Sequence, residues 1–208
     1  MENIKPKFRL GMTAPEVVVE IVRINPDITA VFFKTYTSTK NLEEEPVIQI
    51  RTSIDRMIQH SPNPKESFWL IRKEITLNQL NAIVEGLSQE RALAVTSKVR
   101  LVYPRTISHI PMMDFNCVTS SVNLEKVQEF LRKIGQEGVV LATGRSYHFY
   151  GIRPMTENKW YEFLGRCLLF SDFTDSRYVG HRLIDGFTDL RISREIRRPQ
   201  SPRVVAIL

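Results

Sequence analysis

The sequence predicts an α+β fold in which a mostly antiparallel sheet is packed against helices. The 208 residues are 42 % apolar and 25 % charged, which is the composition of an ordinary globular protein. The second half has the order strand, helix, hairpin, helix, helix and strand, which favours a sheet with helices on one face. No linker divides the chain, so we expect one unit made of two lobes, an N-terminal α/β lobe over residues 1–104 and a second lobe over residues 105–208.

The composition excludes several classes of protein. No apolar run approaches the roughly 20 residues that a membrane-spanning helix needs. The apolar content is too high for a disordered chain. The first ten residues carry charges where a secretion signal would be apolar. Two cysteines, Cys117 and Cys167, are too few for a disulfide scaffold or a cysteine-rich zinc module. We therefore expect a cytoplasmic protein with reduced thiols and no association with membranes.

Positive charge is concentrated at the C-terminal end. The net charge of the whole chain is +6. Residues 176–208 contain seven arginines, no lysine and three acids, so +4 of that charge lies in this segment. The guanidinium group matches phosphate oxygens in a bidentate geometry, which favours phosphate recognition. A solvated basic surface is the alternative interpretation.

The first half contains two helix signals and three strand signals. Thr13 is followed by Pro15 and Glu16, a pattern that predicts the start of a helix. Thr76 begins a second helix with a capping box. The predicted strands cover residues 27–36, 68–71 and 99–103, with a polar loop at 41–46 and a breaker at 61–64.

The second half has clearer boundaries. Asn123 is expected to cap a helix that ends at Gly135, and Thr156 is expected to cap the next one. Glycine in the turn Thr143-Gly144-Arg145 predicts a hairpin. The predicted strands cover 109–117, 139–142, 146–150 and 190–193, and a short helix is expected around 178–184.

Asp114 is an acidic residue inside an apolar strand. Side chains alternate across a strand, so Asp114 and Asn116 are expected on one face, with Met113 and Phe115 on the other. Carboxylate and amide oxygens are suitable ligands for Mg²⁺ or Mn²⁺. A buried carboxylate needs a partner, so an aspartate that holds a turn or an arginine at the strand end is the alternative.

The hairpin carries the second group of candidates. Ser146 and His148 share one face of the returning strand, next to Gly144 and Arg145. A hydroxyl and an imidazole can both donate to phosphate oxygens, and the glycine allows close approach of the backbone. A histidine satisfied by a neighbouring backbone carbonyl is the alternative. A serine hydrolase is disfavoured, because no G-x-S-x-G nucleophile elbow is present.

Asp175 is the third candidate acid. It could complete a metal site with Asp114, or it could simply cap the helix that follows. Asp172 lies one helical turn earlier in the chain and is the substitute ligand if Asp175 is only a cap. Arg177 and Arg191 lie further along the same basic segment.

Taken in order, these residues resemble the motifs of the archaeo-eukaryotic primase superfamily, which includes primase small subunits and primase-polymerases. Its motifs are an acid pair of the D-x-D type, a Ser-x-His and a later single acid. The turn before the histidine and the Leu190-Arg191-Ile192-Ser193 segment support the resemblance, which covers residues 107–205. The matching positions are Asp114-Phe115-Asn116, Ser146-Tyr147-His148 and Thr174-Asp175.

The resemblance implies an RRM-like catalytic half and a nucleotidyltransferase that joins nucleotides on a single-stranded DNA or RNA template by two-metal-ion phosphoryl transfer. It implies that Asp114, Asn116 and Asp175 hold Mg²⁺ or Mn²⁺. It also implies that Ser146 and His148 bind the triphosphate of the incoming nucleotide. From charge and position, the candidate contacts to phosphate or template are Arg145, Arg177 and Arg191.

Asn116 departs from the superfamily pattern, because it brings no charge where the second acid is expected. Two cations held about 3.5–4 Å apart repel each other, so losing a carboxylate should weaken metal binding. A slow or manganese-dependent enzyme, a non-catalytic module that binds nucleotide or single strands, and a structural protein all remain open. No Cys/His cluster matches a zinc knuckle and no helicase segment follows, so we expect a helicase or other replication or repair proteins as partners.

Overall fold

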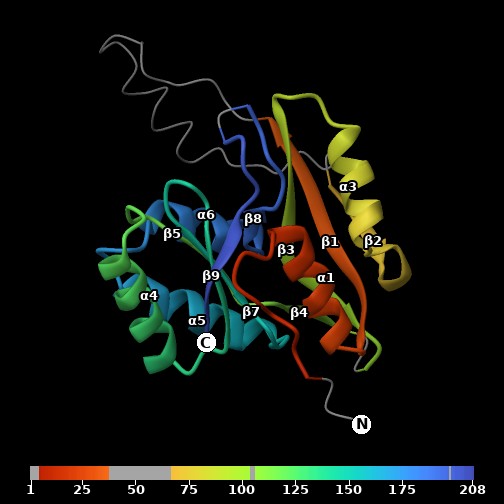
Figure 1. Ribbon diagram of the computed structural model, residues 1–208. Coiled ribbons are helices and arrows are strands. Elements are labelled where there is room, and N and C mark those ends of the chain that lie inside the picture. The colour runs from red at the N-terminus through yellow and green to blue at the C-terminus, as the bar shows by residue number, and fades with distance from the viewer. Residues whose placement is uncertain (1–4, 38–66, 104–105, 197) are drawn as a thin grey trace, which may run out of the picture.

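The protein is an α+β fold with two antiparallel sheets, as the computed structural model shows for residues 5–37, 67–103, 106–196 and 198–208. Figure 1 shows the sheets side by side, with α1 and α3 on the side of β1 and α4 and α5 on the side of β5. The predicted α+β class is confirmed. The loop expected at 41–46 and the breaker at 61–64 lie outside the described residues.

The first sheet is built mainly from the first half of the chain. Its strand order is β2-β1-β3-β4, and β8 pairs with β3 beside this path. All of its pairings are antiparallel. The strands are β1 (Ile28–Thr37), β2 (Ser67–Ile71), β3 (Arg91–Leu101), β4 (Ile107–His109) and β8 (Asp189–Arg191).

The second sheet has the order β5-β7-β6-β9, and it is also antiparallel. Gly144 has a φ of 92° in the turn that joins β6 to β7, a conformation that glycine adopts without strain. The strands are β5 (Met112–Phe115), β6 (Gly138–Ala142), β7 (Tyr147–Gly151) and β9 (Arg203–Ile207).

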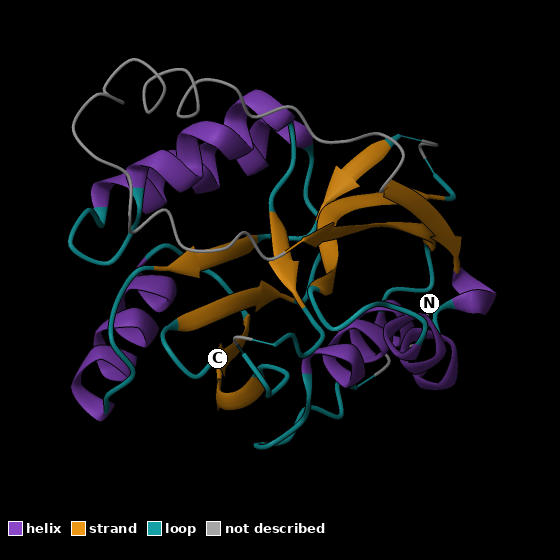
Figure 2. Cartoon of the chain, turned by 90° about the horizontal axis from the view of Figure 1, so that it is seen from above, coloured by secondary structure: helices purple, strands orange, loops and turns teal. Residues whose placement is uncertain are grey.

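Helices cover both sheets and begin where the sequence has capping residues (Figure 2). The Glu16 carboxylate accepts a hydrogen bond of 2.7 Å from the backbone N–H of Thr13, and Thr76 Oγ1 accepts one of 3.2 Å from Gln79. The helices are α1 (Ala14–Ile24), the 3₁₀ turn η3 (Arg72–Glu74), α3 (Leu77–Glu85), α4 (Ser121–Lys133), α5 (Glu157–Leu169) and α6 (Ser176–Asp185). None of these described helices is long and apolar enough to cross a membrane.

Two apolar clusters hold the elements together. In the first, α1 and α3 pack on one face of the first sheet, with Phe33 and Leu93 fully buried. In the second, α4 and α5 pack on one face of the second sheet around Trp160 and Phe149. Tyr150 faces the other way and belongs to the first cluster, so the second sheet is buried on both faces.

Several predicted boundaries are wrong. The strand expected at 109–117 is broken at Ile110 and Pro111, which places β4 and β5 in different sheets. Proline lacks the N–H group that a continuous ladder requires. Strand β3 begins at Arg91 instead of Val99, because pairing with β1 overrides the weak strand propensity of its alanines.

Three smaller corrections concern the second half. Ser120 caps α4 in place of Asn123, and its Oγ accepts from the Asn123 N–H at 3.1 Å. The strand expected at 190–193 is β8, which covers Asp189–Arg191 and pairs with β3. Strand β9 was not predicted, because its apolar residues do not alternate with polar ones.

The lobes expected over 1–104 and 105–208 stay a prediction. The sheets follow the chain differently, because β4 and β8 come after residue 104 and still pair with β3. Strand β8 belongs to the C-terminal segment. It pairs with β3 and also contacts β5, and this placement shapes the candidate site.

Gly138→Ala is expected to destabilise the protein by about 2 kcal/mol or more. A Cβ atom at position 138 would overlap the backbone oxygen of Tyr150 and lie 2.6 Å from Cε2 of Phe149, so β6 could not keep its distance from β7. Urea-induced unfolding measures the change. Gly165→Ala in α5 is the matched control, since a Cβ there meets nothing within 4 Å. It should stabilise by about 0.5–1 kcal/mol. Equal midpoints for Gly138→Ala and the wild type would contradict this packing.

Candidate nucleotide-binding site

Asp114 and His148 are directly opposite each other in neighbouring strands. The register of β5 and β7 pairs Asp114 with His148 and Phe115 with Tyr147. Because side chains alternate, Met113 and Phe115 point into the helix-covered cluster while Asp114 and His148 point to the opposite face. The structure therefore brings together the first two motifs that the sequence singled out.

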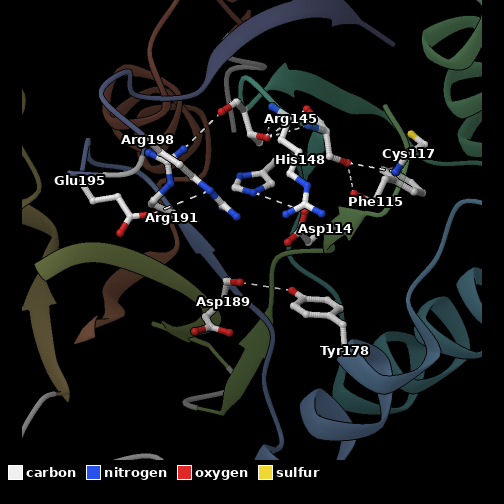
Figure 3. A network of polar contacts seen from close by, with 12 residues as sticks. Asp114, Phe115, Cys117, Arg145, His148, Tyr178, Asp189, Arg191, Glu195 and Arg198 are labelled. Carbon is white, nitrogen blue, oxygen red and sulfur yellow. Dashed lines mark hydrogen bonds and ion pairs between the residues drawn. The ribbon is translucent and has the colours of Figure 1, made fainter. Parts of the chain in front are cut away.

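His148 lies behind Asp114, away from solvent. Its Nε2 atom is 3.6 Å from Oδ1 of Asp114, and its side chain is only 3 % exposed (Figure 3). Burial, together with the positive charges of Arg191 and Arg198, lowers the pKa of His148 to about 3. The imidazole is therefore neutral near pH 7, and its Nδ1 atom has no hydrogen-bond partner among the described residues. It is not satisfied by a backbone carbonyl.

Asp114 is the open member of this pair, with 41 % of its side chain exposed. Loss of water on its protein side raises its pKa to about 6. Arg198, Arg191 and Arg145 oppose this rise, whereas the negative charge of Asp175 adds to it. Because a pKa of about 6 lies below neutral pH, Asp114 is largely ionised at pH 7.

A pocket of about 250 Å³ opens in front of Asp114. It gathers residues that are far apart in the sequence, from β5, the β6–β7 turn, the start of α6 and the segment before β9. Two acids and two arginines face the same space, which suits an anion bound together with a cation. The lining residues are Asp114, Phe115, Asn116, Thr143, Arg145, Ser146, Asp175, Tyr178 and Arg198.

Asp175 has two roles that are compatible. Its Oδ1 atom accepts hydrogen bonds from the backbone N–H groups of Arg177 at 2.9 Å and Tyr178 at 3.3 Å, which makes it the N-cap of α6. The residue also lines the pocket, and its charge acts on Asp114. The cap fixes the carboxylate at the pocket wall.

Ser146 is held by the backbone of β5 and the loop after it. Its Oγ donates to the carbonyl oxygen of Phe115 and accepts from the Cys117 N–H at 3.3 Å. The hydroxyl lines the pocket, but its proton is already committed to a protein acceptor. Ser146 therefore fixes the position of the chain next to Asp114 and Asn116.

The candidate arginines fall into different positions. Arg145 lines the pocket. Arg191 is buried, and its guanidinium donates to the backbone oxygens of Ser193, Gln200 and Thr143, so it acts on the site through its charge alone. Arg177 is exposed and, like Asp172, is not part of the pocket lining.

Sequence reasoning missed two residues of the pocket, Arg198 and Tyr178. Arg198 lines the wall, and its Nε atom is 3.9 Å from Oε1 of Glu195. The concentration of arginine in residues 176–208 was the available signal, but it did not distinguish Arg198 from its neighbours. Tyr178 donates from its hydroxyl to the Asp189 carbonyl at 3.2 Å, a contact that only the fold reveals.

The donors in the pocket fit one divalent cation better than two. Asp114 and Asp175 offer carboxylate oxygens, and Asn116 offers an amide oxygen. Mg²⁺ is commonly held by one or two carboxylates, with water and substrate phosphates in the other positions. Within the described part of the chain, no group of three or more His, Cys, Asp or Glu side chains could hold a metal ion. The donor set therefore suits a single cation shared with a phosphate-bearing ligand.

Comparison with protein families agrees with this geometry. The family described as AEP-like, archaeo-eukaryotic primase 1D-like, matches residues 72–202, which is more than half of the chain. The chain belongs to this archaeo-eukaryotic primase-like family and is thus of the primase-related nucleotidyltransferase kind. The resemblance inferred from the motifs is confirmed. The comparison with curated proteins finds no match, and the comparison with solved structures finds none either.

Replacing Asp175 separates its capping role from its charge. Asp175→Ala is expected to destabilise the protein by about 1 kcal/mol, because the N–H groups of Arg177 and Tyr178 lose their acceptor. Asp175→Asn keeps an oxygen acceptor and should stay within about 0.5 kcal/mol of the wild type. Chemical denaturation measures both variants. An equal loss in the two variants would show that Asp175 stabilises through its charge and not as a cap.

Proposed function

We propose that the protein joins nucleotides on a single-stranded template, as a primase-polymerase-like nucleotidyltransferase. The observation that supports this most directly is the shared pocket, in which Asp114 and Asp175 face Arg145 and Arg198. Carboxylates for a cation and guanidinium groups for phosphates are the two kinds of donor that a nucleoside triphosphate with its cation requires. Membership in the primase-like family supports the same reaction class.

Each side chain has a role in this proposal. Asp114 and Asp175 would hold Mg²⁺ or Mn²⁺, with Asn116 as a neutral oxygen donor beside them. When bound, such a cation would neutralise charge on the triphosphate and polarise a phosphoryl oxygen as a Lewis acid. Arg145 and Arg198 bind the phosphates from the pocket wall, where their donors orient the leaving group.

His148 and Arg191 act from behind the pocket. Neutral His148 fills the space beneath Asp114 and limits the directions its carboxylate can take. Arg191 is fixed by backbone carbonyls, so its positive charge stays in place and favours the ionised form of Asp114. This proposal replaces by positioning roles the phosphate contacts that the resemblance implied for His148 and Ser146, and the one that charge and position predicted for Arg191.

Asn116 favours a second function, a catalytically degenerate module that binds nucleotide or single strands. Asn116 lines the pocket, so a neutral side chain occupies the position where a second carboxylate would contact the cation. A single cation held by two carboxylates could retain a nucleotide without bringing the reacting oxygens into line. The cytoplasmic location and the helicase or other replication or repair partners stay predictions for either function.

Asp114→Asn is expected to reduce template-directed incorporation by about 100-fold or more, because the central ligand of the cation loses its charge. The measurement is extension of a primed template with labelled nucleotides in Mg²⁺ and in Mn²⁺. Asp172→Asn is the matched control, since Asp172 is exposed and does not line the pocket. Wild-type protein that makes no product at any concentration of either cation would remove the catalytic claim and leave the binding function.

Asn116→Asp is expected to lower the Mg²⁺ concentration for half-maximal activity by about tenfold, since the number of charged ligands sets affinity for hard cations. The variant restores the acid pair that Asn116 interrupts. A titration of activity against Mg²⁺ measures the shift, and binding of Mn²⁺ measures it independently of turnover. Asn158→Asp, in the exposed first turn of α5, adds the same charge elsewhere and should change neither value. Unchanged cation affinity in Asn116→Asp would place Asn116 outside the cation's coordination shell.

A further inference from the structure

One face of the first sheet carries aromatic and basic side chains together. Phe33 and Leu93 point to α1 and α3, so the neighbours of these residues along β1 and β3 point to the opposite face. We call this second surface the open sheet face. It is formed by Phe32 and Lys34 of β1, Trp69 of β2, and Lys98 and Arg100 of β3.

The aromatic rings of the open sheet face form a row with cations above them. The centroids of Phe32 and Trp69 are 5.0 Å apart, and those of Phe32 and Phe187 are 5.8 Å apart. The Arg100 guanidinium lies over the Trp69 ring at 4.2 Å, and Lys98 Nζ lies 4.9 Å from the centre of Phe187. Arg100 is exposed, while Phe32, Trp69 and Lys98 are partly exposed.

The charge of this surface is complementary to a polyanion. Lys34 pairs with Asp189 at 2.6 Å. Neither Lys98 nor Arg100 forms an ion pair with an acid of the described chain, and both contact aromatic rings. A basic group beside an aromatic ring suits a nucleotide, since phosphate pairs with the cation while the base stacks on the ring or on the guanidinium plane.

Strand β8 connects the open sheet face to the pocket through a hydrogen bond and an ion pair. Phe187 precedes β8, whose Asp189 pairs with Lys34. The carbonyl of Asp189 accepts from the Tyr178 hydroxyl at 3.2 Å, and Tyr178 lines the pocket beside Asp114. Figure 3 shows Asp189 and Tyr178 next to Asp114. Phe187 itself is buried, so a strand on this face would contact Trp69 and Arg100, with β8 between it and the site.

We propose that the open sheet face binds unpaired single-stranded nucleic acid and leads it to the pocket, with Trp69 and Arg100 as the stacking point. The part of this proposal in which the strand leads to the pocket rests on the proposed function. Binding of the strand to the open sheet face needs no catalysis. Stacking requires bases that are free to leave their neighbours, so a duplex should bind more weakly than a single strand. We expect binding without preference for particular bases, because stacking and phosphate pairing tolerate any sequence.

Intrinsic fluorescence provides a direct test. The chain has two tryptophans, and Trp160 is fully buried, so a base that stacks on the open sheet face can quench only Trp69. Titration of the full chain with oligo(dT) and with oligo(rU) should quench the emission. The Trp69→Phe variant should lose the quenching and bind several-fold more weakly by anisotropy of a labelled oligonucleotide. Binding without any quenching in the wild type would overturn the proposal.

Salt dependence tests the basic residues. The double variant Lys98→Gln/Arg100→Gln should bind at least tenfold more weakly. Its slope of log affinity against log salt should fall by about 1.4, since each phosphate contact on a single strand contributes about 0.7. Arg132→Gln/Lys133→Gln, on the exposed surface of α4, removes the same number of charges, is the matched control and should bind like the wild type. An equal loss in the control and the double variant would show only a general effect of net charge, and the proposal would fail.

Failure of this proposal can be distinguished from failure of the proposed function. Asp114→Asn should bind single strands like the wild type even when it incorporates no nucleotide. If the wild type incorporates nucleotides and the Lys98→Gln/Arg100→Gln variant binds the template normally, the proposed binding surface is contradicted. The proposed function is not affected by that result. If the wild type incorporates no nucleotide but single strands still quench the fluorescence of Trp69, the proposed function is contradicted. The proposed binding surface is then supported. Tighter binding of a duplex than of either single strand would also overturn the proposal.

Discussion

The register between β5 and β7 is the constraint on which the site depends. It places Asp114 opposite His148, and a slip of β5 by one residue would turn Asp114 into the helix-covered cluster. Apolar burial prevents that slip, because Met113, Phe115, Tyr147 and Phe149 fill the space beneath α4 and α5. The hydrophobic face of these strands thus determines where the polar face lies, and the site follows from the packing of residues that take no part in its chemistry.

The electrostatics of the site follow from its position between two sheets. Burial keeps His148 neutral, and backbone carbonyls hold Arg191 in place, so the surroundings of Asp114 do not have to rearrange when a ligand arrives. Such a fixed environment favours the binding of charge without a cost of reorganisation. It also makes Asn116 consequential, since a neutral side chain in this pocket cannot be compensated by moving another acid into its place.

The arrangement of two sheets also explains how distant segments meet. Strand β8 leaves the second half of the chain and pairs with β3, so the end of the first sheet adjoins the pocket. Through Asp189 of this strand, Lys34 of the open sheet face and Tyr178 of α6 are linked by an ion pair and a hydrogen bond. The residues that line the pocket all lie within the segment that matches the primase-like family, whereas Phe32 and Trp69 lie outside it.

The sequence by itself determined the fold class, most helices and the family. Capping residues such as Thr13 and Thr76, and the order of Asp114, His148 and Asp175, depend on local spacing that can be read along the chain. It did not predict β9 or the length of β3, because these depend on which strands pair across the fold, and the break at Pro111 was missed although proline is a local signal.

Only the tertiary structure decided what each candidate residue touches. It placed Arg198 in the pocket, turned Arg191 and Ser146 toward backbone groups and left Arg177 outside. These outcomes result from contacts between segments distant in the sequence. The free energy of such contacts depends on the burial and the partners of each residue in the folded chain. The sequence around a residue does not specify these.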